Sequence, residues 1–213
     1  MVFGQNIWDF YASWYDKLWA QHFVLKPSRN LILQTMKEIP PAVNILDMGC
    51  GIGQLCTDIK KAYPEAKITG IDPSEKMIER AAQDLRHTDI EFQCGFVRDL
   101  SDEPKYDIVV STNAFPYVMD KKETLEKIHN LLNPNGRLLL LFANQNNWYD
   151  ALWLMIVKLS TSKAQYLSVS ATRKMLENSE FKTGKTEKIK GAFFLPSIYM
   201  IEGIVIKNQP QKI

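Results

Sequence analysis

The segment Val43-Asn-Ile-Leu-Asp47-Met-Gly49-Cys-Gly51-Ile-Gly53-Gln54 decides the fold of this 213-residue chain. A short apolar run leads into Asp47, three glycines then alternate with larger residues, and a helical pattern continues to Tyr63. This order predicts a strand, a tight turn and a helix. Glycines let such a turn adopt positive φ angles and let a ligand lie against the main chain, while the N-terminus of the helix favours an anionic group.

Two aspartates flank the expected ligand position. Asp47 precedes the first glycine by two residues, where a carboxylate could accept hydrogen bonds from a positively charged amino group. A second predicted strand, residues 67–71, ends in Asp72, and an acid at this point accepts hydrogen bonds from both hydroxyls of a ribose. Gln54 occupies the position of the third glycine in the dinucleotide fingerprint, which counts against a nicotinamide oxidoreductase.

Four stretches in the same order and spacing resemble the class I S-adenosylmethionine-dependent methyltransferases. They are ILDMGCGIGQL (45–55), ITGIDPSEKMIERA (68–81), YDIVVSTNAFPYV (106–118) and LEKIHNLLNPNGRLLLLF (125–142). The resemblance covers nearly half of the chain. It implies an α/β, Rossmann-like class I methyltransferase fold, with a seven-stranded, mostly parallel sheet, helices on both faces and one reversed strand at the edge. It also implies S-adenosylmethionine as the cofactor.

The resemblance further implies which residues hold the cofactor. Asp72 would hold the ribose hydroxyls, and Asp47 with the Gly49–Gly53 backbone would hold the methionine end. The remaining expected contacts are Tyr15, Cys50, Gly51, Pro73, Met77, Gly95, Phe96, Val97, Ser111 and Asn113.

The adenine position departs from the family pattern. Many members carry Gly-Asp-Ala after the third strand, and that Asp binds the adenine amino group. This chain has Gly95-Phe96-Val97, and Asp99 lies three residues beyond the usual Asp. Two alternatives remain, in which the Phe96 ring stacks on adenine or its backbone N–H binds a ring nitrogen.

Size and composition indicate one soluble domain, residues 1–213. Hydrophobic residues make up 46% of the chain, and the formal net charge of +2 gives no basic footprint for nucleic acid. Three cysteines, odd in number and without paired metal spacing, indicate neither a disulfide framework nor a metal site. The N-terminus has no secretory signal pattern and no apolar run is long enough to span a bilayer, so we expect a cytoplasmic protein.

The N-terminal 40 residues are unusually aromatic and predict a helical lid over cofactor and substrate. Apolar residues recur at helical spacing from Asn6 to His22, which indicates one or two amphipathic helices. In a single helix Tyr11, Tyr15 and His22 would share a face, and Tyr11 and His22 would then contact the substrate. Simple packing of these aromatics on the sheet is the alternative, and a general-base role for His22 is a weaker one.

Residues 143–167 predict a helical cap over the substrate. The helix from Asn147 to Leu159 is apolar almost all round, so it needs a second partner besides the core. An apolar substrate that contacts Trp148 and Trp153, a second copy of the chain and a membrane surface are the candidates. Burial under the N-terminal aromatic segment is the alternative.

The loop after the fourth predicted strand, Ser111 to Tyr117, should face the transferred methyl group, because it follows the carboxyl end of a parallel strand. Phe115 and Tyr117 are the expected substrate contacts there. The loop only superficially resembles the Asn-Pro-Pro-Tyr motif of enzymes that methylate amino groups, because three residues separate Asn113 from Tyr117.

The rest of the chain completes alternating strands and helices. The further strands are expected at residues 90–94, 106–111, 137–142, 183–189 and 198–207, and the further helices at residues 27–38, 75–86, 121–132 and 168–178.

The sequence thus predicts an S-adenosylmethionine-dependent methyltransferase that acts on a small apolar or aromatic molecule, with no residue assigned as catalytic. A non-catalytic partner protein with the same fold is one alternative. Methylation of a lipid-linked or macromolecular substrate is another. Contact with a membrane surface and formation of a homodimer also stay open as partner predictions.

Overall fold

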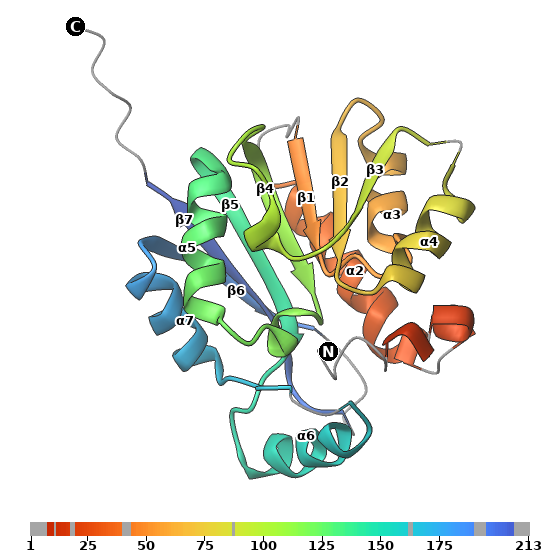
Figure 1. Cartoon of the computed structure of the whole chain (residues 1–213). Coiled ribbons are helices and arrows are strands. Elements are labelled where there is room, and N and C mark those ends of the chain that lie inside the picture. Colours follow the sequence, from red (N-terminus) through yellow and green to blue (C-terminus); the bar gives the residue numbers. More distant parts are fainter. Residues whose placement is uncertain are drawn as a thin grey trace, which may run out of the picture.

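A computed structural model of the chain describes residues 8–10, 12–17, 20–39, 44–86, 88–161, 164–189 and 195–206. Its centre is a seven-stranded sheet in the order β3-β2-β1-β4-β5-β7-β6 (Figure 1), in which β7 alone runs against the other strands. The strands are β1 Asn44–Met48, β2 Lys67–Asp72, β3 Ile90–Cys94, β4 Tyr106–Thr112, β5 Leu132–Ala143, β6 Phe181–Lys188 and β7 Ile198–Val205. The predicted fold class is confirmed, but the reversed strand is not at the edge as expected, because β6 pairs with β7 and forms the edge of the sheet.

Helices cover both faces of this sheet (Figure 1). They are α2 Lys26–Met36, α3 Gln54–Ala62, α4 Glu75–Asp84, α5 Lys121–Leu131, α6 Trp148–Thr161 and α7 Val169–Asn178. Four short helical turns complete the described elements, η1 Ala12–Lys17, η2 Gln21–Leu25, η3 Val97–Asp99 and η4 Phe115–Tyr117. Ser74 caps α4 and Ser168 caps α7, each accepting a backbone hydrogen bond from the first turn.

The central strands are apolar throughout because both faces of the sheet are buried. Along β5, Leu138 and Leu140 pack in a core under α5 and α7, whereas Leu139 and Leu141 pack in a core under α2 and α3. Successive side chains of a strand point to opposite faces, so a continuous leucine run fills both cores. This double burial leaves the loops at the strand ends as the places where a ligand can bind.

The N-terminal segment differs from the predicted amphipathic helix. Residues 8–10 are helical, η1 is a 3-10 turn, and η2 is a π-helical turn that continues into α2. The Gln21 side-chain amide donates to the backbone oxygen of Tyr15 at 3.0 Å, and such a side-chain bond competes with regular helix hydrogen bonding. The shared face expected for Tyr15 and His22 in a single helix therefore does not form, and Tyr11 lies outside the described residues.

Helix α6 occupies a separate place in the fold. It connects β5 to α7 and lies at the bottom of Figure 1, beyond the carboxyl ends of the parallel strands. The same strand ends carry the glycine turn after β1 and the loops after β2 and β4. The fold thus gathers the glycine turn, both loops and α6 at one end of the sheet.

Candidate active site

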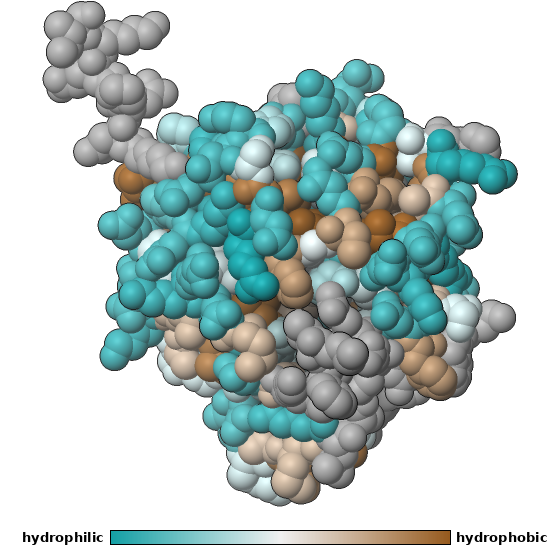
Figure 2. Space-filling view, in the orientation of Figure 1, coloured by the Kyte–Doolittle hydropathy of each residue, from teal (hydrophilic) through white to brown (hydrophobic). Residues whose placement is uncertain are grey.

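A cavity of about 660 Å³ opens at the carboxyl ends of the parallel strands. This volume is within the usual range for small-molecule sites, roughly 300–1,000 Å³. Its walls come from the N-terminal segment, the turn after β1, the loops after β2, β3 and β4, helix α6 and the start of β7. In the space-filling view, tan atoms lie at the bottom of the molecule, where Figure 1 places α6, and brown atoms show between teal ones higher up (Figure 2).

The glycine turn is fixed by close contacts on two sides. Gly49, Gly51 and Gly53 have φ angles of 76°, 55° and 74°, the left-handed region that glycine adopts without strain. The amides of Gly49 and Cys50 both donate to the Ile71 oxygen, at 2.8 and 3.2 Å. A Cβ on Gly49 would lie 2.2 Å from the Ala114 Cβ, so the turn after β1 rests directly on the loop after β4.

Asp72 is held rigidly at the end of β2. Its Oδ2 accepts a hydrogen bond from the Gly51 amide and its Oδ1 accepts one from the Ser74 amide, both at 2.9 Å. Burial raises the pKa of Asp72, and these two backbone donors oppose that rise. Each carboxylate oxygen has a second lone pair, so Asp72 can still accept two hydroxyl groups in the cavity that it lines.

Asp47 lies beneath the glycine turn and does not line the cavity. Its Oδ2 accepts a hydrogen bond from the Cys56 thiol at 3.3 Å, and its Oδ1 has no partner among the described residues. Burial raises the pKa of Asp47 from 3.8 to about 7, opposed by the Cys56 hydrogen bond and assisted by the charge of Asp72. A buried carboxylate oxygen without a donor among the described residues, below a turn whose amides bond elsewhere, is suited to a nearby ammonium group.

We expect this raised pKa to make the free protein less stable as the pH rises. The unfolded carboxyl loses its proton near pH 4 and the folded one only near pH 7, so stability falls between these values. The full effect is on the order of 4 kcal/mol. Asp47→Asn should flatten this slope in urea unfolding measured from pH 4 to 8.

Asp58→Asn provides the matched control, since it neutralises a more exposed aspartate that pairs with Arg29. A slope between pH 4 and 7 that survives in Asp47→Asn would contradict the assignment to Asp47.

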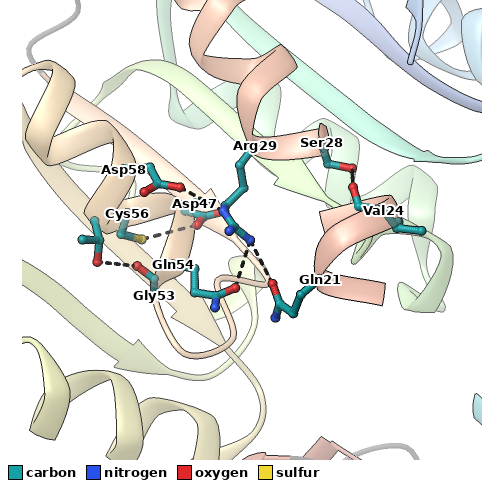
Figure 3. Close-up of polar contacts among 10 residues, drawn as sticks. Gln21, Val24, Ser28, Arg29, Asp47, Gly53, Gln54, Cys56 and Asp58 are labelled. Carbon is teal, nitrogen blue, oxygen red and sulfur yellow. Dashed lines mark hydrogen bonds and ion pairs between the residues drawn. The ribbon is translucent and has the colours of Figure 1, made fainter. Parts of the chain in front are cut away.

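Gln54, the residue that breaks the dinucleotide fingerprint, anchors the N-terminal helices to this turn. Figure 3 shows the Arg29 guanidinium between three acceptors. It donates to Asp58 at 2.9 Å, to the Gln54 side chain at 2.9 Å and to the Gln21 side chain at 3.3 Å. A glycine at position 54 would remove the contact that joins the start of α3 to α2.

The loop after β3 offers a ring rather than a carboxylate to the cavity. The Phe96 amide donates to Asp99 Oδ2 at 2.9 Å, so that this N–H is already satisfied within the chain. The guanidinium of Arg98 lies 4.5 Å from the centre of the Phe96 ring. Of the two alternatives for Phe96, the geometry therefore favours stacking over an amide hydrogen bond.

The N-terminal segment packs over the glycine turn. Trp8, Ala12 and Tyr15 form a small apolar cluster with Ile52 and Met77. A Cβ on Gly51 would lie 4.0 Å from the Tyr15 ring. Burial raises the pKa of the Tyr15 hydroxyl, so this side chain is neutral at physiological pH.

Polar contacts tie the same segment to the helix that follows Asp72. The Ser74 hydroxyl donates to Asp9 at 2.5 Å, and the Arg80 guanidinium pairs with Asp16 at 3.0 Å. Arg80 also donates to the backbone oxygen of Ala12. The segment therefore packs against the start and middle of α4 and contributes Trp8 and Tyr15 to the cavity wall.

The half of the cavity away from the glycine turn, here called the far half, has an aromatic and aliphatic wall. Tyr117 contacts Trp8 edge to face, with ring centres 5.2 Å apart, and its hydroxyl lies 3.5 Å from that of Tyr166. From α6, Trp153, Leu154 and Val157 line the same space. This half of the cavity suits a flat or apolar molecule.

Most of the predicted site residues meet at the cavity. Those that line it are Tyr15, Gly49, Gly51, Asp72, Pro73, Met77, Gly95, Phe96, Val97, Asn113, Tyr117 and Trp153. Asp47, Cys50, Gly53 and Ser111 are buried behind this lining, in or under the turn. Cys50, Gly53 and Ser111 would affect a ligand through the backbone that they support, whereas Asp47 also offers its oxygen without a partner among the described residues.

Three expected substrate contacts lie elsewhere. Phe115 is fully buried and packs on Phe142 with ring centres 5.7 Å apart, because the η4 turn points it into the core. Trp148 is 78% exposed on the outer side of α6, and His22 is exposed on η2. None of these three side chains lines the cavity, so the structure contradicts their expected contacts with the substrate.

Sequence reasoning missed several lining residues. They include Trp8, Val24, Leu25, Leu154, Val157, Tyr166 and Pro196. Trp8 stands in the aromatic run that predicted a lid, and Leu154 and Val157 stand in the apolar helix. No local sequence pattern marks Tyr166 or Pro196, because only the tertiary fold brings them to the cavity.

The strand order, the glycine turn and the acid at the end of β2 together define a class I methyltransferase fold. The chain belongs to the methyltransferase domain family, because a family model described as "Methyltransferase domain" matches residues 39–190. The resemblance found in the sequence is confirmed, and with it S-adenosylmethionine as the cofactor of this fold.

Individual relatives agree with this membership. The malonyl-[acyl-carrier protein] O-methyltransferase of Priestia megaterium is 35% identical over 97 residues, which are 46% of this chain and 35% of that protein. The chain thus matches only about a third of the length of that curated relative. A Haloferax volcanii methyltransferase, solved in complex with the Trm112 methyltransferase activator, superposes with a TM-score of 0.79 at 18% identity, covering 94% of this chain and 98% of that one.

A second solved structure of similar fold contains a bound ligand. The magnesium protoporphyrin IX methyltransferase of Synechocystis PCC 6803, with bound SAH, superposes with a TM-score of 0.66 at 21% identity. It covers 83% of this chain and 81% of that one. At these identities the structural likeness concerns the fold alone.

The residues present fit S-adenosylmethionine. Asp72 offers two fixed acceptors for the ribose, Gly49 and Gly51 line the cavity without a side chain, and the Asp47 oxygen that has no partner among the described residues lies below them. No helix among the described residues is long and apolar enough to cross a membrane.

Proposed function

We propose that the protein transfers the methyl group of S-adenosylmethionine to a small apolar or aromatic molecule. One observation carries this proposal. A single cavity runs from the glycine turn and Asp72 to the wall formed by Tyr117, Trp153 and Tyr166. A donor held at the first end would present its methyl group toward an acceptor at the second.

In this proposal the chain acts by positioning. Bound S-adenosylmethionine supplies a methyl group on a sulfonium sulfur, and the methyl–sulfur bond breaks as the acceptor–methyl bond forms. Asp72 holds the ribose, the Gly49 and Gly51 backbone cradles the methionine end, and Tyr15 covers the turn. Holding two reactants in line and excluding water lowers the barrier without a covalent intermediate.

The lining also restricts the acceptor. Among the described residues that line the cavity there is no histidine, lysine or cysteine, and Asp120 and Glu123 are exposed carboxylates. The described residues thus place no strong base beside the far wall. The proposal therefore favours an acceptor atom that is already nucleophilic, such as a carboxylate, a phenolate or a thiolate.

A screen of such acceptors tests the proposal. The purified protein is incubated with S-adenosylmethionine and aromatic or aliphatic carboxylates, phenols and thiols, and formation of the demethylated cofactor is measured. Trp153→Ala should lower kcat/KM for an active acceptor roughly tenfold, since about 1.5 kcal/mol of apolar burial is lost. Cofactor affinity should stay within about twofold of wild type.

Trp148→Ala is the matched control, because that tryptophan stands on the same helix but outside the cavity. Equal losses in the two variants would place the acceptor elsewhere. Absence of turnover with every acceptor, despite cofactor binding, would move the substrate to another chemical class.

Malonyl attached to an acyl carrier protein is a second candidate substrate. The relative from Priestia megaterium is named for this acceptor, and a free carboxylate needs no base. Comparing carrier-linked malonate with malonate and its small thioesters as acceptors would separate the two candidates. Turnover of the carrier-linked form alone would favour this second candidate.

A non-catalytic partner with the same fold is the alternative from another class. It predicts a folded protein that binds neither S-adenosylmethionine nor its demethylated product. Calorimetry with both compounds decides between them, because the proposed enzyme must bind at least one.

A further inference from the structure

Helix α6 has two apolar sides, and the cavity accounts for only one of them. Trp153, Leu154 and Val157 line the cavity. On the outer side Trp148 is 78%, Leu152 48%, Met155 56% and Ile156 50% exposed. These four residues, here called the α6 stripe, follow helical spacing and form one exposed apolar surface, which is typical of an interaction site.

The one exposed charge on the described part of α6 is positive. The acidic and basic side chains of this helix are Asp150 and Lys158, and the Lys158 amino group lies 6.0 Å from the centre of the Tyr166 ring. Asp150 is buried, where its carboxylate accepts hydrogen bonds from the Ser197 amide at 2.8 Å and the Asn146 amide at 3.1 Å. Lys158 is exposed, so the helix presents apolar side chains and a cation but no exposed carboxylate among its described residues.

The turn η2, which also lines the cavity, has a similar character. Val24 and Leu25 line the cavity, while Phe23 is 45% exposed and Lys26 is exposed. Residues 20–30 contain no aspartate or glutamate. The carboxylates of the cavity rim, Asp120 and Glu123, come instead from the loop after β4 and the start of α5.

We propose that the α6 stripe docks the protein on the surface of an anionic lipid bilayer. An interfacial helix buries an apolar side, with tryptophan at the headgroup level, and attracts anionic lipids through its lysines. Trp148 at the start of α6, the apolar stripe and Lys158 match this description. Figure 1 shows α6 at one end of the molecule, apart from the sheet, where a planar surface can reach it.

The size of the stripe favours a bilayer over a second copy of the chain. The exposed fractions of the four stripe residues correspond to roughly 400–500 Å² in total, to which Trp148 contributes the most. A stable protein–protein interface needs about 800 Å² from each partner. An interfacial helix needs no such area, because several apolar side chains and a nearby cation suffice for reversible binding.

Docking at α6 would connect the bilayer with the cavity. The side chains that line the cavity and those that form the α6 stripe lie on different sides of the same helix. An apolar acceptor in the lipid would then reach Trp153 without crossing water. This consequence depends on the proposed function, whereas the docking itself does not.

Vesicle binding of the full chain tests the docking without cofactor or acceptor. Binding is measured by cosedimentation with vesicles of phosphatidylcholine alone and of phosphatidylcholine with 30% phosphatidylserine. We expect binding to the anionic vesicles that weakens with salt and is at least fivefold weaker on neutral ones. Leu152→Gln/Ile156→Gln should weaken binding at least tenfold, and Lys158→Glu at least threefold on anionic vesicles alone.

Matched controls are Ile206→Gln, at an apolar residue 58% exposed after β7, and Lys174→Glu on α7. Circular dichroism and binding of the demethylated cofactor confirm that each variant is folded. Failure of the wild-type chain to bind anionic vesicles would overturn the proposal, as would wild-type binding by the double variant. A dimer in light scattering that the double variant dissociates would assign the stripe to a second copy instead.

Discussion

Gly49→Ala is expected to destabilise the protein by about 2–5 kcal/mol, a fall of roughly 10 °C in Tm. Two effects add up. The new Cβ would lie 2.2 Å from the Ala114 Cβ, and an alanine at a φ of 76° is strained by about 1–2 kcal/mol. Thermal and urea unfolding measure the loss.

Two further variants separate these effects. Gly51→Ala carries the strain at a φ of 55° but meets no atom closer than 4.0 Å, so it should lose only about 1–2 kcal/mol. Ala114→Gly combined with Gly49→Ala should recover the part due to the clash. Equal losses in the Gly49 and Gly51 variants, or no recovery in the double variant, would show that the contact with Ala114 is unimportant.

Asp72→Asn is expected to weaken cofactor binding by roughly 10–100-fold, since hydrogen bonds to a charged acceptor contribute about 1.5–3 kcal/mol. One carboxylate oxygen is replaced by an NH2 group, which cannot accept a hydrogen bond from a ribose hydroxyl. The same change disturbs the Gly51 amide, which donates to this side chain. Calorimetry with S-adenosylmethionine and with its demethylated product measures the change.

Glu91→Gln is the control for Asp72→Asn, because Glu91 is an exposed acid on the neighbouring strand and does not line the cavity. Unfolding curves of both variants must show that the fold is intact. A dissociation constant for Asp72→Asn within threefold of wild type would place the ribose away from the end of β2.

The sheet and its turns could be predicted because their residues act locally. The leucines of β5 fill two cores at once, and the glycines after β1 adopt angles that other residues avoid. Such constraints leave a signature within a few residues. The bounds of β2, α4 and α7 accordingly agree with the predicted ones to within two residues at most ends.

The inner and outer sides of α6 could not be predicted, because the helix is apolar almost all round. Periodicity could not show which side faces outward, and in the structure this side carries Trp148, Leu152 and Met155. The deciding residue is Asp150, whose carboxylate binds the Ser197 amide across the fold. That contact joins residues far apart in sequence and has no local signature.

The helix predicted for the N-terminal segment was wrong for a related reason. Its aromatic spacing suits a helix, yet the Gln21 side chain bonds the Tyr15 backbone and Arg80 holds Asp16. Phe115 was misplaced because the η4 turn, not the strand before it, sets its direction. In both places side-chain contacts from distant elements override the local pattern.

The pairing of Trp8 with both Tyr15 and Tyr117 has a kinetic consequence. The ring centres of Trp8 and Tyr15 lie 6.5 Å apart and those of Trp8 and Tyr117 5.2 Å apart, so one short segment covers the glycine turn and also walls the far half of the cavity. If this segment moves to admit the donor, the part of the cavity wall that would contact the acceptor moves with it. For the proposed reaction we therefore expect an ordered cycle, in which the donor binds first and its demethylated product leaves last.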